Sequence, residues 1–400
     1  MSDAQSRLKE FHQKISDDLQ RSVDFWVKYS HDEEHGGFLN CVGADGKVYD
    51  DTKYSWFQSR QVYTYASILR AAPDVVKDKA KMLQAAESGA EFLMNKVKNS
   101  DTSRCYFMTT RDGRPIKYQN SIFTETFYTM AMLELYEVTK KEIYQKEGIS
   151  MLDKIIYWAQ VDDTELGNTP LAGHTPSSFL AVPMVLLHLC QLPLPAEKKK
   201  ELKSAEEKCV QEILSHIQRE GSVILEYVSP DGKELSNSFG RHLNPGHAIE
   251  CGWFLLQYAI STGDTELQKT AIDKFIVNPF KGAWDEKYGG LFHMLDVDGF
   301  SPTPLGWDMK LWWPHTEVLI GFMLAWKTTQ DSQFLDKFQQ VFDYCYDHFV
   351  DKENGDWFGY LNRRGEVTHT FKGGPWKGCF HAIRYQIICR GILQEAISNQ

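Results

Sequence analysis

The sequence lacks the features of a membrane, secreted or nucleic-acid-binding protein. Its opening stretch, MSDAQSRLKEFHQK, contains no apolar segment of the kind that a signal peptide needs. The longest apolar run, FLAVPMVLLHLC, is too short to span a bilayer and holds a proline and a histidine. The 44 lysines and arginines are outnumbered by 54 aspartates and glutamates, giving a net charge of −10. Without a basic stripe, nucleic acid is not expected as a partner.

Paired cysteine motifs are also missing. The two closest of the eight cysteines are ten residues apart, and none forms C-x-x-C; they stand at positions 41, 105, 190, 209, 251, 345, 379 and 389. This pattern predicts buried, reduced thiols in a cytoplasmic protein rather than a disulfide framework.

Convincing metal-ligand spacing is absent as well. The stretch HDEEH at 31–35 fits H-x-x-E-H, a zinc-peptidase spelling. That motif requires the interior of a helix, whereas here two glycines follow at once. We interpret the stretch as a helix end and expect no metal.

What the sequence does contain is a repeat in its turns. Five stretches, starting at residues 36, 104, 222, 289 and 355, each place an Asp-Gly or Arg-Gly turn between two short runs. This is the signal of a β-hairpin. One gap is about twice the others, so we expect a degenerate copy near residue 165, where the chain reads ELGNTPLAG.

Long helical patterns alternate with these hairpins. Twelve helices are predicted, at 5–30, 56–73, 76–97, 121–138, 141–159, 178–191, 196–218, 246–262, 264–277, 312–328, 331–350 and 377–397. A regular period indicates stacked units that cannot bury their faces alone. Six helical hairpins predict one all-α domain over residues 1–400, an (α/α)6 barrel with β-hairpins at one rim. An open solenoid would need a polar terminal cap, which the apolar last helix does not supply.

Ionisable side chains gather where the even-numbered helices begin. Because a hairpin precedes each of these helices, their starts should share one rim. They carry Arg60, Glu125, His247, Glu250, His315, Glu317, His381 and Arg384, whereas the helix at 178–191 is the apolar exception. Buried charge is unfavourable unless it is paired or lines a cavity. Polar groups among tryptophans and phenylalanines suit a sugar, which has apolar C–H faces and a rim of hydroxyls.

Each of these residues also has a purely structural interpretation. His247 could be a satisfied core histidine, and Arg60 could be the ion-pair partner of Glu125 or Glu250. Glu317 could interact with the dipole of its own helix N-terminus. Three histidines at equivalent repeat positions favour function over structure.

Several motifs together resemble one known family. They are RQVYTY, FYTMAM, NPGHAIECGWFLL, KLWWPHTE, WFGYL and KGGPWKGCFH, spread through the chain, and they resemble the N-acylglucosamine 2-epimerase family. The resemblance implies an (α/α)6 barrel that interconverts N-acetyl-D-glucosamine and N-acetyl-D-mannosamine, a precursor of sialic acid. It implies His247 and His381 as the acid/base pair, with Arg60, Glu250 and Glu317 as further catalytic residues.

The resemblance also implies ligands and partners. The expected substrate-binding residues are Tyr63, Glu125, Trp313, His315 and Trp376. ATP or another nucleotide is implied as an activator rather than a reactant, together with a homodimer and, as a further partner, renin. Relatives acting on cellobiose or mannose carry another histidine on the sixth helix. This chain has Pro183 and Met184 there and His188 a turn later, which favours the N-acetyl sugar branch.

Epimerisation at C2 explains why two histidines are useful. The C1 aldehyde of the open-chain sugar acidifies the C2 proton, so that one base can remove it to give an enediolate-like anion. A second group then returns a proton to the opposite face, and both groups need a pKa near neutrality. Arg60 could hold the oxygen on which charge develops. Glu250 or Glu317 could orient an imidazole.

Three other functions remain open at this point. A glycosidase on the same barrel would use two carboxylates, which Glu125, Glu250 and Glu317 could supply. An aldose–ketose isomerase would use the same enediolate and return the proton at C1. A protease-binding protein would show no turnover at all.

Overall fold

The computed structural model describes residues 3–167, 172–173 and 175–399, and these fall into two compact units. Unit 1 is formed by residues up to 169 together with 351–357 and 370–400. Unit 2 is formed by residues 170–350 and 358–369. The degenerate hairpin expected near residue 165 lies largely outside the described residues, and the prediction of a single domain over 1–400 stays a prediction.

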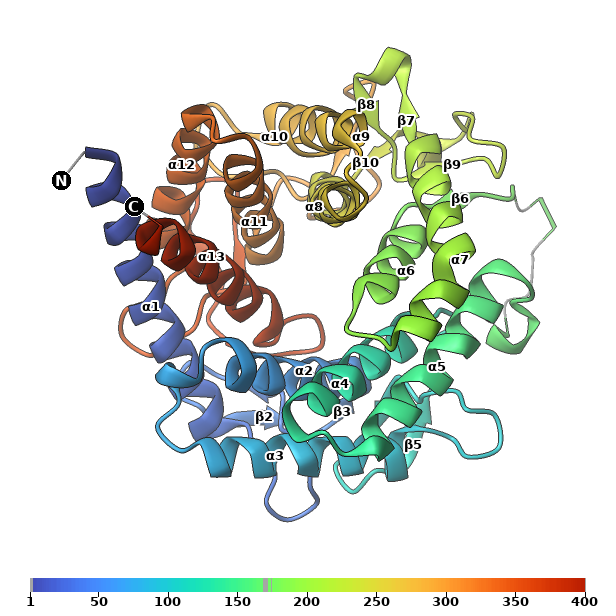
Figure 1. Ribbon diagram of the computed structural model, residues 1–400, viewed down its shortest axis with the longest axis vertical. Helices are drawn as coiled ribbons and strands as arrows, with labels where there is room; N and C mark the ends of the chain where they lie inside the picture. Colours follow the sequence, from blue (N-terminus) through green and yellow to red (C-terminus); the bar gives the residue numbers. More distant parts are fainter. Residues whose placement is uncertain (1–2, 168–171, 174, 400) are drawn as a thin grey trace. The chain divides into compact units, whose positions relative to one another are not determined.

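Unit 1 is built from six α-helices arranged in two layers (Figure 1). α2 packs against α4 on one side and α13 on the other, and α1, α3 and α5 cover this row. The helices are α1 (Asp3–Tyr29), α2 (Ser55–Ala71), α3 (Lys79–Phe92), α4 (Phe123–Thr139), α5 (Glu142–Gln160) and α13 (Phe380–Ser398). The first layer therefore contains three even-numbered helices of the predicted series.

Unit 2 repeats this two-layer design. α8 packs between α6 and α11, and these three are covered by α7, by α9 with α10, and by α12. The helices are α6 (Ala181–Gln191), α7 (Ala196–Ser215), α8 (Pro245–Thr262), α9 (Thr265–Thr270), α10 (Asn278–Ala283), α11 (Trp312–Thr329) and α12 (Ser332–His348). The predicted helix 264–277 is α9, continued through a π-helical turn, η6 (Ala271–Val277), into α10.

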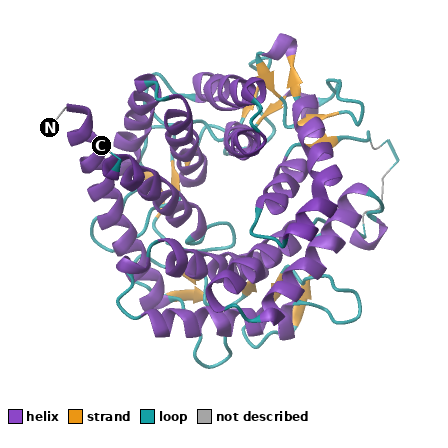
Figure 2. Ribbon diagram, viewed as in Figure 1, coloured by secondary structure: helices purple, strands orange, loops and turns teal. Residues whose placement is uncertain are grey.

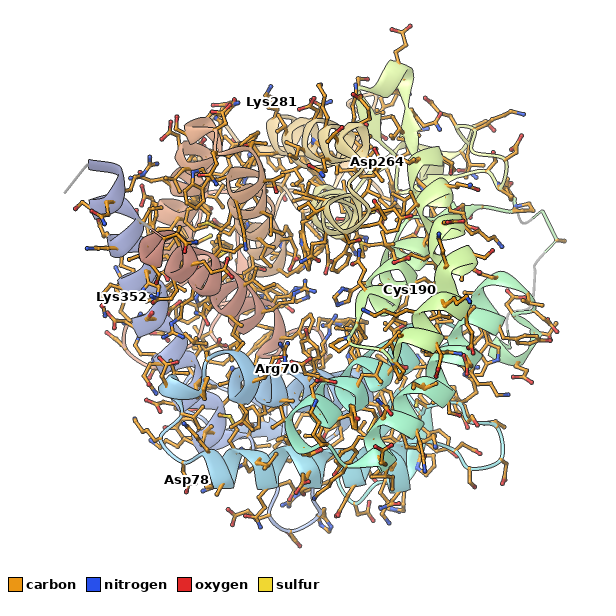
Figure 3. The ribbon with its side chains drawn as sticks, in the orientation of Figure 1. Arg70, Asp78, Cys190, Asp264, Lys281 and Lys352 are labelled. Carbon is orange, nitrogen blue, oxygen red and sulfur yellow. The ribbon has the colours of Figure 1, made fainter. Side chains whose placement is uncertain are left out.

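Local sequence explains where the helices begin and which faces they bury. Asp78 and Asp264, both labelled in Figure 3, are N-caps whose carboxylates accept from backbone N–H groups in the first turn of α3 and α9, each at 2.9 Å. Arg70, also labelled, links α2 to α4 by donating from Nε to Glu134 at 2.8 Å. Residues 124–135 of α4 are all buried, as expected for a helix that is apolar around most of its circumference.

Short strands connect consecutive repeats (Figure 2). In each case the strand directly before an even-numbered helix pairs antiparallel with the first strand of the following hairpin. The pairs are β3 (Lys53–Tyr54) with β4 (Met108–Thr109), β6 (Ser178–Phe179) with β9 (Tyr227–Val228), β10 (His242–Leu243) with β11 (Leu295–Asp296), and β12 (Lys310–Leu311) with β13 (Tyr360–Leu361). A strand of the next repeat therefore holds the residues directly before each of four helices, which are α2, α6, α8 and α11.

Three of the five predicted hairpins form as predicted. They are β1 (Cys41–Val42) with β2 (Val48–Asp50), β4 with β5 (Pro115–Lys117), and β13 with β14 (Val367–His369). The two predicted from 222 and 289 form their turns but lack a second strand among the described residues. Their first strands, β9 and β11, pair with β6 and β10 instead. The other short pair is β7 (Ile217–Gln218) with β8 (Val223–Ile224).

A buried ion cluster explains the stretch HDEEH in unit 1. Asp32 accepts from Lys53 at 2.9 Å and from two nitrogens of Arg111 at 3.0 and 2.9 Å. The turn closes through Gly36 and Gly37, at φ of 75° and 68°, a region that favours glycine. A carboxylate followed by two glycines therefore builds a turn here.

The same cluster recurs in unit 2 at the stretch WDEKYGG. Asp285 accepts from Lys310 at 3.1 Å and from Arg363 at 3.0 Å. Gly289 and Gly290 adopt φ of 73° and 74°. In both units the lysine lies two residues before an even-numbered helix, and the arginine comes from the turn of the next hairpin. We call this arrangement the Asp–Lys–Arg cluster.

Each of the eight cysteines is buried as a thiol. Across the part of the chain that the structure describes, no helix combines the length and the apolar character needed to cross a membrane.

Candidate functional site

His247 lies in the first turn of α8, as the sequence predicts. Asn244 is the N-cap, and its Oδ1 accepts from the backbone N–H of His247 at 3.2 Å. Pro245 occupies the first helical position, where its missing N–H is not needed. The Asn-Pro-Gly-His stretch thus fixes the backbone from which the imidazole projects.

A carboxylate that sequence reasoning missed holds the imidazole of His247. Glu226, which immediately precedes β9, places Oε1 2.6 Å from Nδ1 of His247. The amide nitrogen of Asn244 lies 2.8 Å from the same Nδ1 and 3.4 Å from Oε1 of Glu226. Although burial acts to lower the pKa of His247, the Glu226 carboxylate leads the attractive effects that leave this pKa raised above its ordinary value. The sequence signal that could have revealed Glu226 is its position as a lone charge inside the apolar run SVILEYV.

Trp313 packs beside His247 with ring centroids 5.3 Å apart. The start of α8 allows this approach because residue 246 is glycine. A β-carbon on Gly246 would lie 2.5 Å from the Trp313 ring. Trp313 from α11 and His247 from α8 therefore form one wall of polar and aromatic atoms in unit 2.

Glu250 and Glu317 lie near His247 and add to the negative charge around it. Both contribute to raising the pKa of His247, after Glu226. Glu317 is fully buried and accepts from Nε1 of Trp253 at 3.0 Å. The catalytic roles expected of Glu250 and Glu317 stay predictions, and Glu226 makes the close contact with Nδ1 of His247.

Unit 1 carries a second cluster around Arg60 of α2. The Cζ atom of Arg60 lies 4.0 Å from the ring centroid of Phe127 and 5.1 Å from that of Phe380. Trp56 lies at 5.2 Å. Aromatic rings on three sides restrict the guanidinium to a small range of positions while preserving its charge. Glu125 pairs with another arginine of unit 1, since its Oε1 accepts from Nε of Arg104 at 2.9 Å.

His381 lies in this second cluster, at the start of α13. Its side chain is buried, and Nδ1 lies 3.5 Å from Nη2 of Arg384, one turn further along the helix. A guanidinium can only donate, so Nδ1 of His381 accepts in this contact. Phe380 links the two residues to Arg60, because Arg384 Cζ lies 4.5 Å from its ring.

Two predicted substrate-binding residues border the cluster of unit 1. Tyr63 packs against Phe380 at 5.5 Å, and burial raises the pKa of its hydroxyl. Trp376 is 60% exposed and meets Trp56 edge to face at 5.3 Å. An exposed indole beside a confined guanidinium suits a ligand with an apolar face and polar edges.

Two other predicted substrate-binding residues are fully buried and bond to backbone groups. His315 is fully buried, its Nδ1 donates to the Leu311 carbonyl at 2.6 Å, and its Nε2 accepts from Leu291 N–H at 2.9 Å. Glu125 is fully buried and also accepts from the backbone N–H of Cys105 at 2.8 Å. Both side chains therefore help to hold the fold, and substrate binding by either residue stays a prediction.

Two more histidines discussed above, His188 and His31, contact aromatic side chains. His188 stacks on Phe254 with centroids 4.3 Å apart. His31, from HDEEH, bonds through Nε2 to the hydroxyl of Tyr65 at 2.9 Å. Within the described ranges, no three His, Cys, Asp or Glu side chains are grouped so that they could hold a metal ion.

Comparison with known proteins gives one consistent result. A sequence model of the family described as N-acylglucosamine 2-epimerase (GlcNAc 2-epimerase) matches residues 36–384. The N-acylglucosamine 2-epimerase of Rattus norvegicus is 46% identical over 98% of this chain and 94% of its own length. The enzyme of that name from Homo sapiens is 44% identical over 100% of this chain and 94% of its own.

Solved structures confirm the fold class. The cellobiose 2-epimerase of Bacillus thermoamylovorans B4167 superposes with a TM-score of 0.82, covering 97% of this chain and 100% of that one at 20% identity. That likeness confirms the predicted all-α, α/α-barrel fold class with short strands.

Proposed function

Because the chain belongs to the N-acylglucosamine 2-epimerase family, we propose that it interconverts N-acetyl-D-glucosamine and N-acetyl-D-mannosamine at C2. The observation that carries this proposal is the 46% identity to an enzyme of that name over nearly the whole chain. The contact between His247 and Glu226 supports it, since a carboxylate at Nδ1 is a common way to prepare an imidazole for proton transfer.

The proposed reaction moves one proton off C2 and another onto its opposite face. With the sugar in its open form, the base takes the C2 proton, and the electron pair delocalises onto the C1 oxygen. The resulting enediolate-like anion then collapses as the second group delivers a proton to C2. We propose His247 and His381 for these two roles, which exchange when the reaction runs backwards.

Arg60 is proposed to stabilise the anion. A guanidinium confined by Phe127, Phe380 and Trp56 is preorganised, so it need not reorient as negative charge develops. Glu250 and Glu317 are proposed to shape the field around His247. Tyr63, Trp313 and Trp376 supply aromatic surface for the sugar.

Family membership also supports the remaining parts of the proposal. They are activation by ATP or another nucleotide, a homodimer, a cytoplasmic location, and renin as a further partner. The rate of turnover, measured with and without added ATP, tests the activation. Size-exclusion chromatography on a calibrated column tests the homodimer.

Proton NMR of pure N-acetylmannosamine with the purified protein tests the function directly. The expected result is the appearance of N-acetylglucosamine signals until the two sugars reach equilibrium. Formation of a ketose would instead indicate an aldose–ketose isomerase. No change with either sugar, with and without ATP, would overturn the proposal.

A further inference from the structure

We propose that Glu226 is a positioning residue, which keeps a proton on Nδ1 of His247 and so leaves Nε2 to exchange protons with the sugar. The inference rests on the proposed function, because it assigns His247 to proton transfer. It adds Glu226, which lies directly before β9, to a site whose other proposed residues lie mostly near the starts of helices.

The contact geometry determines which ring nitrogen holds the proton. An ionised carboxylate has no proton to donate, so at 2.6 Å Nδ1 of His247 must donate to Oε1 of Glu226. The amide of Asn244 is oriented by its Oδ1, which accepts from the His247 backbone. Its NH2 group lies 2.8 Å from Nδ1 of His247 and 3.4 Å from Oε1 of Glu226. A protonated Nδ1 cannot accept, so the amide N–H is left to the carboxylate oxygen, and the two donors share that one acceptor.

Glu226 is buried, and its printed contacts all run through one oxygen. The residue is 4% exposed, and its Oε2 has no hydrogen-bond partner among the described residues. Its Oε1 is committed to the imidazole of His247 and to the N-cap Asn244.

The charged groups around His247 come from several elements. Glu226 leads, followed by Glu250 on the same helix and Glu317 on α11. His293, from the segment before β11, is kept neutral by burial, which lowers its pKa to about 4. The carboxylates outnumber the cations here, so loss of Glu226 should lower the pKa of His247.

The first experiment uses the isosteric variant Glu226→Gln. The glutamine oxygen can still accept from Nδ1 and from Asn244, so the variant removes charge but keeps the tautomer. His247 acts as a base only when it is neutral, and activity starting from the epimer that it deprotonates is lost as pH falls through its pKa. With that pKa lowered, the acid limb of the kcat/KM profile should move to lower pH.

The second variant, Glu226→Ala, removes the acceptor as well. We expect kcat to fall by about 10²-fold or more, by analogy with the loss of an orienting carboxylate in a Ser-His-Asp triad. KM should change much less, because Glu226 acts through His247. The matched control is Glu234→Gln, which changes a carboxylate seven residues after the start of β9 that pairs with Arg219 at the surface. It should leave kcat within about twofold of the wild-type value and the acid limb at the wild-type pH.

A measurement on the wild-type protein does not depend on whether the variants fold. Histidine labelled with 15N, with the His247 signal assigned by its absence in His247→Asn, reports which ring nitrogen is protonated. We expect protonated Nδ1 and unprotonated Nε2 above the His247 pKa. A protonated Nε2, or a folded Glu226→Gln with an unmoved acid limb, would overturn the inference. A wild-type protein without epimerase activity would overturn the proposed function instead.

Discussion

Two buried carboxylates of unit 2 use their oxygens in different ways. In the Asp–Lys–Arg cluster, Asp285 accepts from Lys310 and Arg363 through Oδ2 and from the backbone N–H of Lys287 through Oδ1. Glu226 accepts through Oε1 alone. The first carboxylate joins one repeat to the next, whereas the second holds an imidazole at a helix start.

The two carboxylates differ in the kind of partner that they hold. Desolvation acts to raise the pKa of Asp285, but the Arg363 and Lys310 side chains keep it below its ordinary value, and burial lowers the pKa of Lys310 to about 8. The Asp32 cluster of unit 1 is built in the same way. The Asp–Lys–Arg cluster therefore recurs with the repeat and belongs to the fold, whereas the contact of Glu226 with His247 belongs to the proposed chemistry.

The largest expected effect is on the chemical side of this comparison. His247→Asn and His381→Asn should each abolish net epimerisation in both directions, because the reaction must cross both faces of C2. Each variant should still exchange the C2 proton of one epimer in D2O, while the lost half-reaction slows by about 10²–10⁴-fold. Deuterium incorporation into each pure epimer, followed by NMR, measures both. If one variant loses exchange from both epimers while the other keeps both, a single base is at work.

The next effect is on the structural side. Asp285→Asn should lower the free energy of unfolding by about 3–5 kcal/mol, because it leaves the fully buried Lys310 without its charge partner. Denaturant unfolding measures the change, with the surface variant Glu234→Gln as the control, expected to change stability by less than about 1 kcal/mol. A loss as small as that of the control would remove the distinction drawn above.

Arg60→Lys tests whether a confined charge is enough for catalysis. Lysine keeps the charge but not the planar fork that fits between Phe127 and Phe380. We expect kcat/KM to fall by about 10²-fold, as for loss of one donor to a developing oxyanion. Steady-state kinetics in both directions measure the fall. Near-normal kinetics with unchanged unfolding would return Arg60 to a purely structural role.

The smallest effect concerns His315, a histidine without a catalytic role in the proposal. Burial lowers its pKa from 6.5 to about 3. Between these values the unfolded chain binds a proton that the folded chain does not, so stability is full above pH 6.5 and falls as pH drops towards 3. The slope is at most about 1.4 kcal/mol per pH unit for one such group. His315→Gln should make the unfolding free energy less dependent on pH in this window; an unchanged slope would contradict the assignment.

The sequence predicted features that rest on local chemistry. The helix predicted at 246–262 begins at Pro245 in the structure, and the alternation of turns and helices predicted the repeat. Arg60 and His381, each predicted near the start of a helix, both pack beside Phe380 in unit 1.

Features that depend on distant partners were not predicted. The turns at 229–233 and 296–299 looked like complete hairpins, but β9 and β11 pair with strands about fifty residues earlier. The helix position of His315 resembles that of His247, and only the Leu291 and Leu311 backbone contacts distinguish them. Glu226 reaches His247 across 21 positions, a pairing that no helical or strand period indicates.

The pairing between β12 and β13 has a consequence for synthesis on the ribosome. Lys310 and Leu311 of β12 find their strand partners only in Leu361 and Tyr360 of β13, about fifty residues later. At about 5–20 residues per second, several seconds pass before that partner emerges. During this time β12 is an open edge, able to pair with another chain. The start of α11, which carries Trp313 and Glu317, is therefore among the last parts of unit 2 to gain its strand pairing. A nascent chain that stalls near residue 350 still lacks β13, so β12 stays unpaired.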